Sequence, residues 1–380
     1  LKQMWRDTSS VSYANQYLSE ASRVDTLMSD QSNSISTGMS SFFSQLQTAI
    51  NDPTNAASRQ LVMGGAQTLL NKFNTLSTQM TAQNKYLSQQ LETDAADANE
   101  QIGVIARLNQ EILAYGNNPA KPPPLDLLDK RDQAIKELSA LVDINVLDAE
   151  NGDKQVFLSS GQSLVLENGK FNLFSVAGEP DPNRKTLQLK AGTNQNVVIN
   201  ISETDLGGKI GASLEFRTKV LDPAQRELGQ LALAFTDAMN TQNRLGMDAD
   251  GNLGGDLFSL PSFSALPFSS NTGTGAITAS VAAGQGKNIP ANDVRITFTA
   301  ADAFTVEALD ASGNVIPGTA ISRTGVTFPV TVTSDDTNDF FGLNITLTNG
   351  APAFAAGDKF DLKPLSIACL LYTSPSPRDG

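Results

Sequence analysis

Two carboxylates of this sequence have the spacing that paired-acid catalysis uses. Asp129 and Asp132 lie three positions apart in a segment with helical periodicity, so both would face one side of a helix, as the two acids of a glycosidase must. Lys130 and Arg131 separate them, and acidic residues are typical of a first helical turn, where they face the positive end of the helix dipole. We therefore interpret the pair as part of a helix start.

A second acidic string resembles the beginning of a calcium-binding loop. Asp248-Ala249-Asp250-Gly251-Asn252 places oxygen-bearing side chains at alternate positions, and Asp256 follows in a ligand-like position. The glycine comes earlier than in such a loop, and Ser259 stands where a bidentate glutamate is needed. We interpret the string as a solvated turn that follows a helix.

The sequence offers no candidate residues for other kinds of chemistry. The chain has no histidine and a single cysteine, Cys369, which excludes His-based acid–base and nucleophile pairs, an intramolecular disulfide and a multi-cysteine metal site. The strings Gly207-Gly208 and Gly284-Gln285-Gly286-Lys287 lack the spacing of a phosphate loop and predict turns. We expect no catalytic, cofactor-binding or metal-binding residue, no cofactor and no enzymatic activity.

Charge and hydropathy exclude two classes of partner. The 380 residues include 27 Lys and Arg against 40 Asp and Glu, a net charge of -13 with no basic stripe, so nucleic acid is not expected. No apolar run reaches the roughly 18 residues of a membrane-spanning helix, so no membrane is expected. The length suffices for two or three domains with their own cores.

The first 115 residues have the composition and periodicity of helices. Three apolar stripes are expected, in order along the chain: Leu18, Val24, Leu27 and Met28; Met39, Phe42, Phe43, Leu46 and Ile50; and Leu61, Val62, Leu69, Leu70, Phe73, Leu76, Met80 and Leu87. Between the last two, Asp52 is expected to cap a new helix whose first position is Pro53.

The clearest periodicity defines what we call the 91–112 seam. Its members are spaced alternately by four and three: Leu91, Ala95, Ala98, Ile102, Ile105, Asn109 and Ile112. Three heptads only just reach the length of a coiled coil, so packing inside an ordinary helical bundle is favoured over contact with a neighbouring chain. Asn109 would cost stability there but fix the register.

Later segments alternate between strands and helices. Asp126 is expected to cap a helix that runs to Leu141, and period-two patterns follow up to Ile201. Helix returns near Leu206, and Asp222 followed by Pro223 predicts a fresh helix start. From about residue 263, Thr-rich alternating stretches predict a second β module.

These patterns predict an α+β multidomain chain. We expect a discontinuous, elongated helical bundle, with a small β insert, followed by a separate all-β domain. The expected parts are 1–142 (helical, first part), 143–205 (β insert), 206–262 (helical, returning part), 263–365 (all-β) and 366–380, a probable non-native tail.

Several segments, taken in order, resemble the bacterial flagellar hook-associated protein 1 family, whose members form the first junction between hook and filament. The matching strings are Asp52-Pro53 with Arg59-Gln60, Leu127-Leu128-Asp129-Lys130-Arg131-Asp132, Leu214-Glu215-Phe216-Arg217, Leu228-Gly229-Gln230-Leu231, Asn240-Thr241-Gln242 and Asp358-Lys359-Phe360-Asp361-Leu362-Lys363-Pro364. Their order and spacing together are specific, over residues 10 to 365. The family's long terminal helices are not found, and the tail from Cys369 resembles translated sequencing adapter.

The resemblance implies a structural function without catalysis. It implies an extracellular subunit of the flagellum, exported by the flagellar secretion apparatus without a cleaved signal peptide. The implied partners are other copies of itself, the hook protein, the next junction protein and an export chaperone for a C-terminal segment. Without the terminal helices that drive assembly, this chain is expected to be a monomer.

Two other classes of function were weighed. A secreted adhesin-like or phage-tail-like protein would hold glycan on aromatic platforms of its last β module, but 263–365 offers phenylalanine only, with no Trp or Tyr. A peptidoglycan hydrolase would need an acid of raised pKa in a cleft, and no candidate exceeds the helix-start interpretation.

Overall fold

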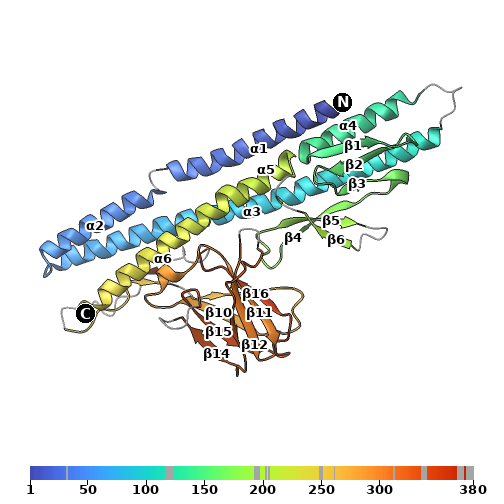
Figure 1. Ribbon diagram of the computed structural model, residues 1–380. Helices are drawn as coiled ribbons and strands as arrows, with labels where there is room; N and C mark the ends of the chain where they lie inside the picture. The colour runs from blue at the N-terminus through green and yellow to red at the C-terminus, as the bar shows by residue number, and fades with distance from the viewer. Residues whose placement is uncertain are drawn as a thin grey trace. The chain divides into compact units, whose positions relative to one another are not determined.

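The computed structural model describes residues 1–30, 33–116, 123–191, 197–201, 203, 206–247, 251–260, 262–310, 313–334 and 340–365, together with the backbone of 372–373 (Figure 1). Long helices form the N-terminal region and a separate sheet-rich region follows, so the predicted fold class is confirmed. The chain divides into two compact units, each built from two stretches of sequence: unit 1 is Leu1–Asp25 with Ala82–Leu221, and unit 2 is Thr26–Thr81 with Asp222–Gly380. The four-part division expected from the sequence stays a prediction.

Unit 1 gathers helices around the 91–112 seam. It contains most of α1 (Lys2–Ser29), the later part of α3 (Ala56–Tyr115), α4 (Leu125–Leu141), α5 (Gly208–Phe216) and the π-helical segment η3 (Arg217–Leu221). Every seam residue from Leu91 to Asn109 is at most 3% exposed, and only Ile112 is half-buried. The seam is therefore used inside the subunit, as predicted. It packs with Trp5, Ile135 and Ile210 in one core.

Two antiparallel three-stranded sheets complete unit 1. The first has the order β1 (Ile144–Asp148), β2 (Lys154–Leu158), β3 (Ser163–Val165), and the second β4 (Leu173–Ala177), β5 (Thr186–Ala191), β6 (Val197–Asn200). Val156, Leu158, Leu187 and Leu189 join the helical core. In β2 and β5 buried residues alternate with half-buried ones, which is the period-two pattern from which strands were predicted, whereas β6 is exposed along its whole length.

Unit 2 combines helices with a phenylalanine cluster. Its helices are α2 (Ile35–Asn51), the first part of α3 and α6 (Asp222–Arg244). Phe42 is fully buried, with its ring centroid 5.8 Å from that of Phe235 and 6.2 Å from that of Phe258. Edge-to-face arrangements of this kind add to the stabilisation from burial alone.

The sheet-rich region of unit 2 contains a four-stranded and a five-stranded antiparallel sheet. The first has the order β14 (Val330–Thr333), β15 (Leu343–Thr348), β10 (Ala276–Val281), β8 (Phe263–Ser264), and the second β13 (Ile321–Arg323), β12 (Ala303–Ala308), β11 (Val294–Ala300), β16 (Lys359–Leu362), β9 (Leu266–Pro267). A further pair joins β7 (Phe258–Ser259) to β17 (Tyr372–Thr373). Ile277, Ile296, Phe304 and Leu347 lie in one core shared by the two larger sheets.

Two predicted helix starts are wrong in detail. The helix after Asp52 begins at Ala56 and is capped by Asn55, whose Oδ1 accepts from the Ala57 amide at 2.9 Å. Helix α4 begins at Leu125, before Asp126, and has no side-chain cap. The reason in both cases is that a proline one or two residues upstream fixes the turn and lets the helix begin at a neighbouring residue.

The third predicted start, at Asp222, coincides with the first residue of α6 (Asp222–Arg244). Helical structure nevertheless continues without interruption from α5 through η3 into α6, so the break expected before Asp222 is absent. A proline in a helix interior removes one amide donor and crowds the preceding turn, and a π-helical turn is a known way to absorb such a defect. Pro223 therefore follows a widened turn, where the sequence suggested a break.

The first two predicted stripes are only partly correct. Val24 and Phe42 are buried, but Leu18 is 66% exposed and Ile50 62% exposed. In the third stripe, Leu69, Leu70 and Phe73 are buried as expected, whereas Leu61 is exposed. None of the described helices combines the length and the apolarity that crossing a membrane requires.

Candidate functional site

The paired acids Asp129 and Asp132 lie on α4 beyond its first turn, in which the acidic residue is Asp126. Asp126 receives the Lys130 ammonium at 2.7 Å in an exposed ion pair. The residue between the two acids does more: Arg131 is 4% exposed and donates to Asn109 Oδ1 at 3.0 Å and to the Gly152 carbonyl at 3.1 Å. Burial lowers the pKa of Arg131, against the nearby carboxylates, which raise it.

Asn109 explains the polar position of the 91–112 seam. Its Nδ2 donates to the Lys154 carbonyl at 2.9 Å, and its Oδ1 accepts from the Lys154 amide at 3.1 Å as well as from Arg131. The asparagine therefore ties α3 to the start of β2 and to α4. Asn109 therefore fixes the register of strand β2 against helix α3, and not the register of a coiled coil.

The calcium-like string is only partly within the described residues, since residues 248–250 lie outside them. Asp256 forms a bidentate pair with Arg244, with Nε–Oδ1 at 2.6 Å and Nη2–Oδ2 at 2.8 Å. Gly251 has a φ of 82°, and Met247 pairs with Leu253 in an isolated bridge. The described part of the string is a turn whose acid is held by arginine, and no metal ligand set is found among the described residues.

Both glycine strings lie at helix starts, not in plain turns: α5 begins at Gly208, and Gly286–Asn288 form the 3-10 helix η4. Gly208 has a φ of 55°, and a Cβ there would lie 2.5 Å from the Leu141 carbonyl carbon. Its amide donates to Ser9 Oγ at 3.1 Å, which joins the beginning of the chain to the returning helix. In the second string, the Gly284 and Gly286 amides donate to the two carboxylate oxygens of Asp237 on α6.

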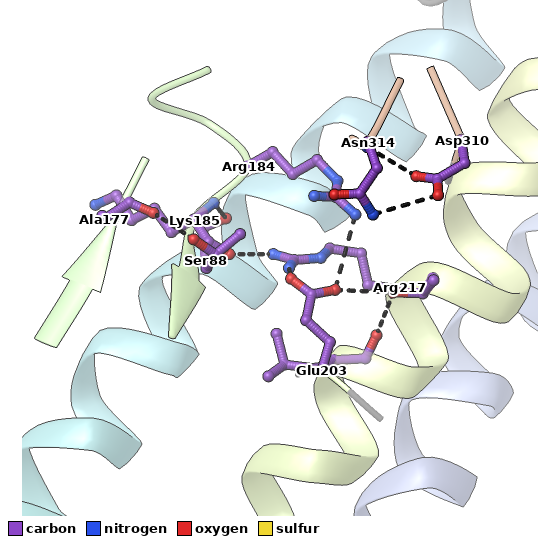
Figure 2. Close-up of polar contacts among 11 residues, drawn as sticks. Ser88, Ala177, Arg184, Lys185, Glu203, Arg217, Asp310 and Asn314 are labelled. Carbon is purple, nitrogen blue, oxygen red and sulfur yellow. Dashed lines mark hydrogen bonds and ion pairs between the residues drawn. The ribbon is translucent and has the colours of Figure 1, made fainter. Parts of the chain in front are cut away.

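Figure 2 shows the most highly connected ion cluster of unit 1. Arg217, 1% exposed, donates to Glu203 Oε1 at 2.8 Å and to the Lys185 carbonyl at 2.6 Å. Glu203 also accepts from Thr218 and lies 3.8 Å from the Arg184 guanidinium. Ser88 on α3 donates to the Asn183 carbonyl at 2.6 Å. The cluster holds the β4–β5 turn against α3 and the π-helical segment.

A second buried acid lies on α1. Glu20 is fully buried and accepts from the Gln16 amide at 2.7 Å and from the Gln83 amide at 2.6 Å. Burial raises the pKa of Glu20, against Arg23, Gln83 and Lys209, which lower it. The carboxyl has no open cleft around it, so it positions α1 on α3 and has no access to a substrate. Its neighbours in the sequence gave no signal of this burial.

The motifs that carried the family resemblance in unit 2 are packing devices. Asn240 on α6 donates to the Phe258 carbonyl at 2.7 Å and accepts from the Phe258 amide at 2.9 Å. Gly229 faces the Leu365 carbonyl oxygen, which would lie 2.2 Å from any Cβ. The reciprocal amide pair and the missing Cβ fix two segments of the sheet-rich region onto α6.

Asp358 also holds separate segments of the chain together, next to strand β16 of the five-stranded sheet. Its carboxylate accepts from the amides of Thr272, Gly273 and Ala355 at 2.8, 3.1 and 2.9 Å. Burial raises the pKa of Asp358, but these hydrogen bonds outweigh it and hold the pKa below its ordinary value. Next to it, Asp361 forms a bidentate pair with Arg295.

The contacts described for the polar residues that were singled out from the sequence join one helix, turn or strand to another. The residues that sequence reasoning missed are Arg217 with Glu203, and Glu20. Arg217 was visible within the Leu214-Glu215-Phe216-Arg217 string, but a buried arginine cannot be told from a surface one by sequence. Residues 366–371 and 374–380, which include Cys369, lie outside the described residues.

Comparison with known proteins relates the chain to structural proteins. The profile of the "Flagellar hook-associated protein FlgK helical domain" matches residues 21–258. The chain is 33% identical to flagellar hook-associated protein 1 of Salmonella typhimurium over 352 residues, and 33% identical to that of Escherichia coli over 350 residues, covering 92% of this chain and 60% of each relative.

A solved structure agrees with these sequence matches. The flagellar hook junction protein FlgK from Burkholderia pseudomallei superimposes with a TM-score of 0.78 at 27% identity, over 98% of this chain and 64% of that one. The chain belongs to the flagellar hook-associated protein FlgK family. It spans about 60% of the length of the curated relatives that it matches.

Proposed function

We propose that this chain is a structural subunit of the bacterial flagellum that joins hook to filament by subunit packing, without catalysis. The observation that carries the proposal is the family match over residues 21–258, combined with a superposition that covers nearly the whole chain. The printed names of the relatives describe hook-associated and hook junction proteins. The proposed location is extracellular, after export by the flagellar secretion apparatus.

The chemistry of the molecule supports this function. Its buried polar groups are committed to helices, turns and strands, as in the Arg217–Glu203 pair and the Asn240–Phe258 clamp. A subunit that must keep its shape under mechanical load gains from such contacts, because each fixes one element on another. The partners proposed are other copies, the hook protein and the next junction protein. An export chaperone and a monomeric state of the 380-residue chain belong to the same proposal.

The proposal is tested by replacing the native junction protein of a flagellated bacterium with the complete reading frame that contains this sequence. Antibodies against residues 263–365 should label the boundary between hook and filament in electron micrographs, and filaments should stay attached. The double variant Asp129→Asn with Asp132→Asn should attach filaments equally well, because these acids have no catalytic function here. Label spread over the cell surface would contradict the proposal.

The adhesin-like alternative is not favoured. Among the described residues of 263–365, six of nine phenylalanines are buried: Phe263, Phe298, Phe304, Phe340, Phe354 and Phe360. The remaining three are half-buried, so the described surface of this region has no exposed aromatic platform for a sugar ring.

A further inference from the structure

Strand β6 forms an open and apolar sheet edge in unit 1. It is the last strand in the order β4-β5-β6, and among the described residues it pairs with β5 alone. Val197 is 57% exposed, Val198 52% and Ile199 37%. Native edge strands are normally blunted by lysine, proline or a bulge, because free amides and carbonyls pair with other strands. Val197–Asn200 has none of these, and its register with β5 is regular.

The opposite edge of the same sheet is closed. The Phe174 amide of β4 donates to Asn99 Oδ1 at 2.7 Å, and Asn99 Nδ2 donates to the Phe174 carbonyl at 2.9 Å. The side-chain amide of α3 therefore occupies the place of a neighbouring strand. Since one edge is protected in this way and the other is not, β6 is the edge at which a further strand can be added.

Strand β14 is a second open edge, located in unit 2. It ends the order β14-β15-β10-β8 and, within the described part of the chain, pairs only with β15. It has the same four-residue length as β6, contains neither charge nor proline, and exposes Thr331 and Thr333.

Charge favours contact between copies at these two sheets. The four strands of the β14 sheet carry no charged residue, and the three strands of the β6 sheet carry only Lys190, which pairs with Val198. Two copies with a net charge of -13 each repel one another over most of their surfaces. An encounter through these sheets avoids that repulsion, since neither sheet presents an acid.

Symmetry decides which edges meet. A junction that joins two different structures along one axis is polar, so its neighbouring subunits are related by rotation about that axis and touch through different surfaces. A β6–β6 pair needs a two-fold axis and does not fit. We propose, on the basis of the function proposed above, that β6 of one subunit pairs with β14 of the neighbouring copy in the junction.

The size of the contact agrees with a monomer in dilute solution. A stable complex buries about 1,200 Å² or more, and two four-residue strands bury much less. The pair forms where assembly already holds neighbours at high effective concentration. Its contribution is to orient adjacent subunits within the junction.

The test uses cysteine cross-linking in assembled flagella. The complete reading frame, carrying Val198→Cys and Thr331→Cys, replaces the native junction protein. Hook–filament particles are treated with a bismaleimide that spans roughly 10 Å, two strand spacings. We expect a cross-linked dimer joining positions 198 and 331, identified by mass spectrometry. Its yield should be at least about tenfold above that of the pair Val198→Cys with Leu253→Cys, whose second position is equally open.

Each other outcome has a distinct meaning. Attached filaments without excess cross-linking would refute the β6–β14 contact and leave the proposed function intact. Dimers from Val198→Cys alone would show a β6–β6 pair and would also refute it. Detached filaments with the complete reading frame that carries no substitution would contradict the proposed function itself. A last control adds Val198→Lys, a charge that protects the edge, to the cysteine pair Val197→Cys with Thr331→Cys. If this charge leaves the yield of cross-linked dimer unchanged, the contact is likewise refuted.

Discussion

Arg217 is the residue on which most of the buried electrostatics of unit 1 depends. Replacing it with methionine removes one partner of Glu203, which keeps Thr218 and Arg184, and leaves the Lys185 carbonyl without this donor. Breaking a buried ion pair from one side costs about 3–5 kcal/mol. We expect Arg217→Met to lower the free energy of unfolding by that amount in urea titrations. The double variant Arg217→Met with Glu203→Gln should recover part of the lost free energy of unfolding. If the effects of the two substitutions simply add, Arg217 and Glu203 are not coupled.

Glu20 predicts a pH dependence with a definite sign. Because burial raises its pKa above that of the unfolded chain, its protonated form favours folding, and this contribution is lost as the pH rises through the folded-state pKa. The variant Glu20→Gln should therefore melt at a higher temperature than the unmodified protein at pH 7. The difference should shrink near pH 4. Glu100→Gln, which removes the same charge from an exposed position of α3, is the control and should show no such trend.

At the scale of elements, the 91–112 seam separates folding from assembly. Ile102 is fully buried among α3, α4 and α5. Placing an unpaired carboxylate there costs several kcal/mol, enough to unfold a marginally stable domain. Ile102→Asp should lower the melting temperature strongly. If sedimentation instead showed a folded monomer produced from an oligomer, the seam would be an interface.

Two glycines on helices of unit 2 predict opposite responses to alanine. Alanine stabilises an exposed helix interior by up to about 1 kcal/mol relative to glycine. At Gly64 no atom lies within 4 Å of the added Cβ, so Gly64→Ala should raise stability. At Gly229 the Leu365 carbonyl oxygen would lie 2.2 Å away, so Gly229→Ala should lower it. Denaturant titration of both variants distinguishes the packing effect from helix propensity.

The sequence was most informative where periodicity was long. The 91–112 seam, the strands after Ile144 and the return to helix near Leu206 are all present, because repeated apolar spacing reflects a continuous buried face. Helix starts were misjudged at Asp52 and Asp126, since capping depends on backbone geometry that neighbouring prolines alter. The Arg217–Glu203 pair and the burial of Glu20 arise from long-range packing, which no local pattern reports.

At the scale of the whole molecule, we propose that the 380-residue chain is a monomer in dilute solution. The largest helical seam is internal and the open edges β6 and β14 are short. Sedimentation equilibrium of the 380-residue chain at micromolar concentration should give the monomer mass of 40.3 kDa. A dimer that persists on dilution, and that Val198→Lys leaves unchanged, would show an interface elsewhere.

The contact between Ser9 and Gly208 means that unit 1 cannot finish folding before its last segment is available. Unit 1 begins with Leu1–Asp25 but is completed only by a segment that ends at Leu221, and the Ser9–Gly208 hydrogen bond spans 199 positions. Native contacts at such separations form slowly, since a long loop must close first. A chain that leaves a channel from its N-terminus cannot complete this unit until more than half of it has emerged.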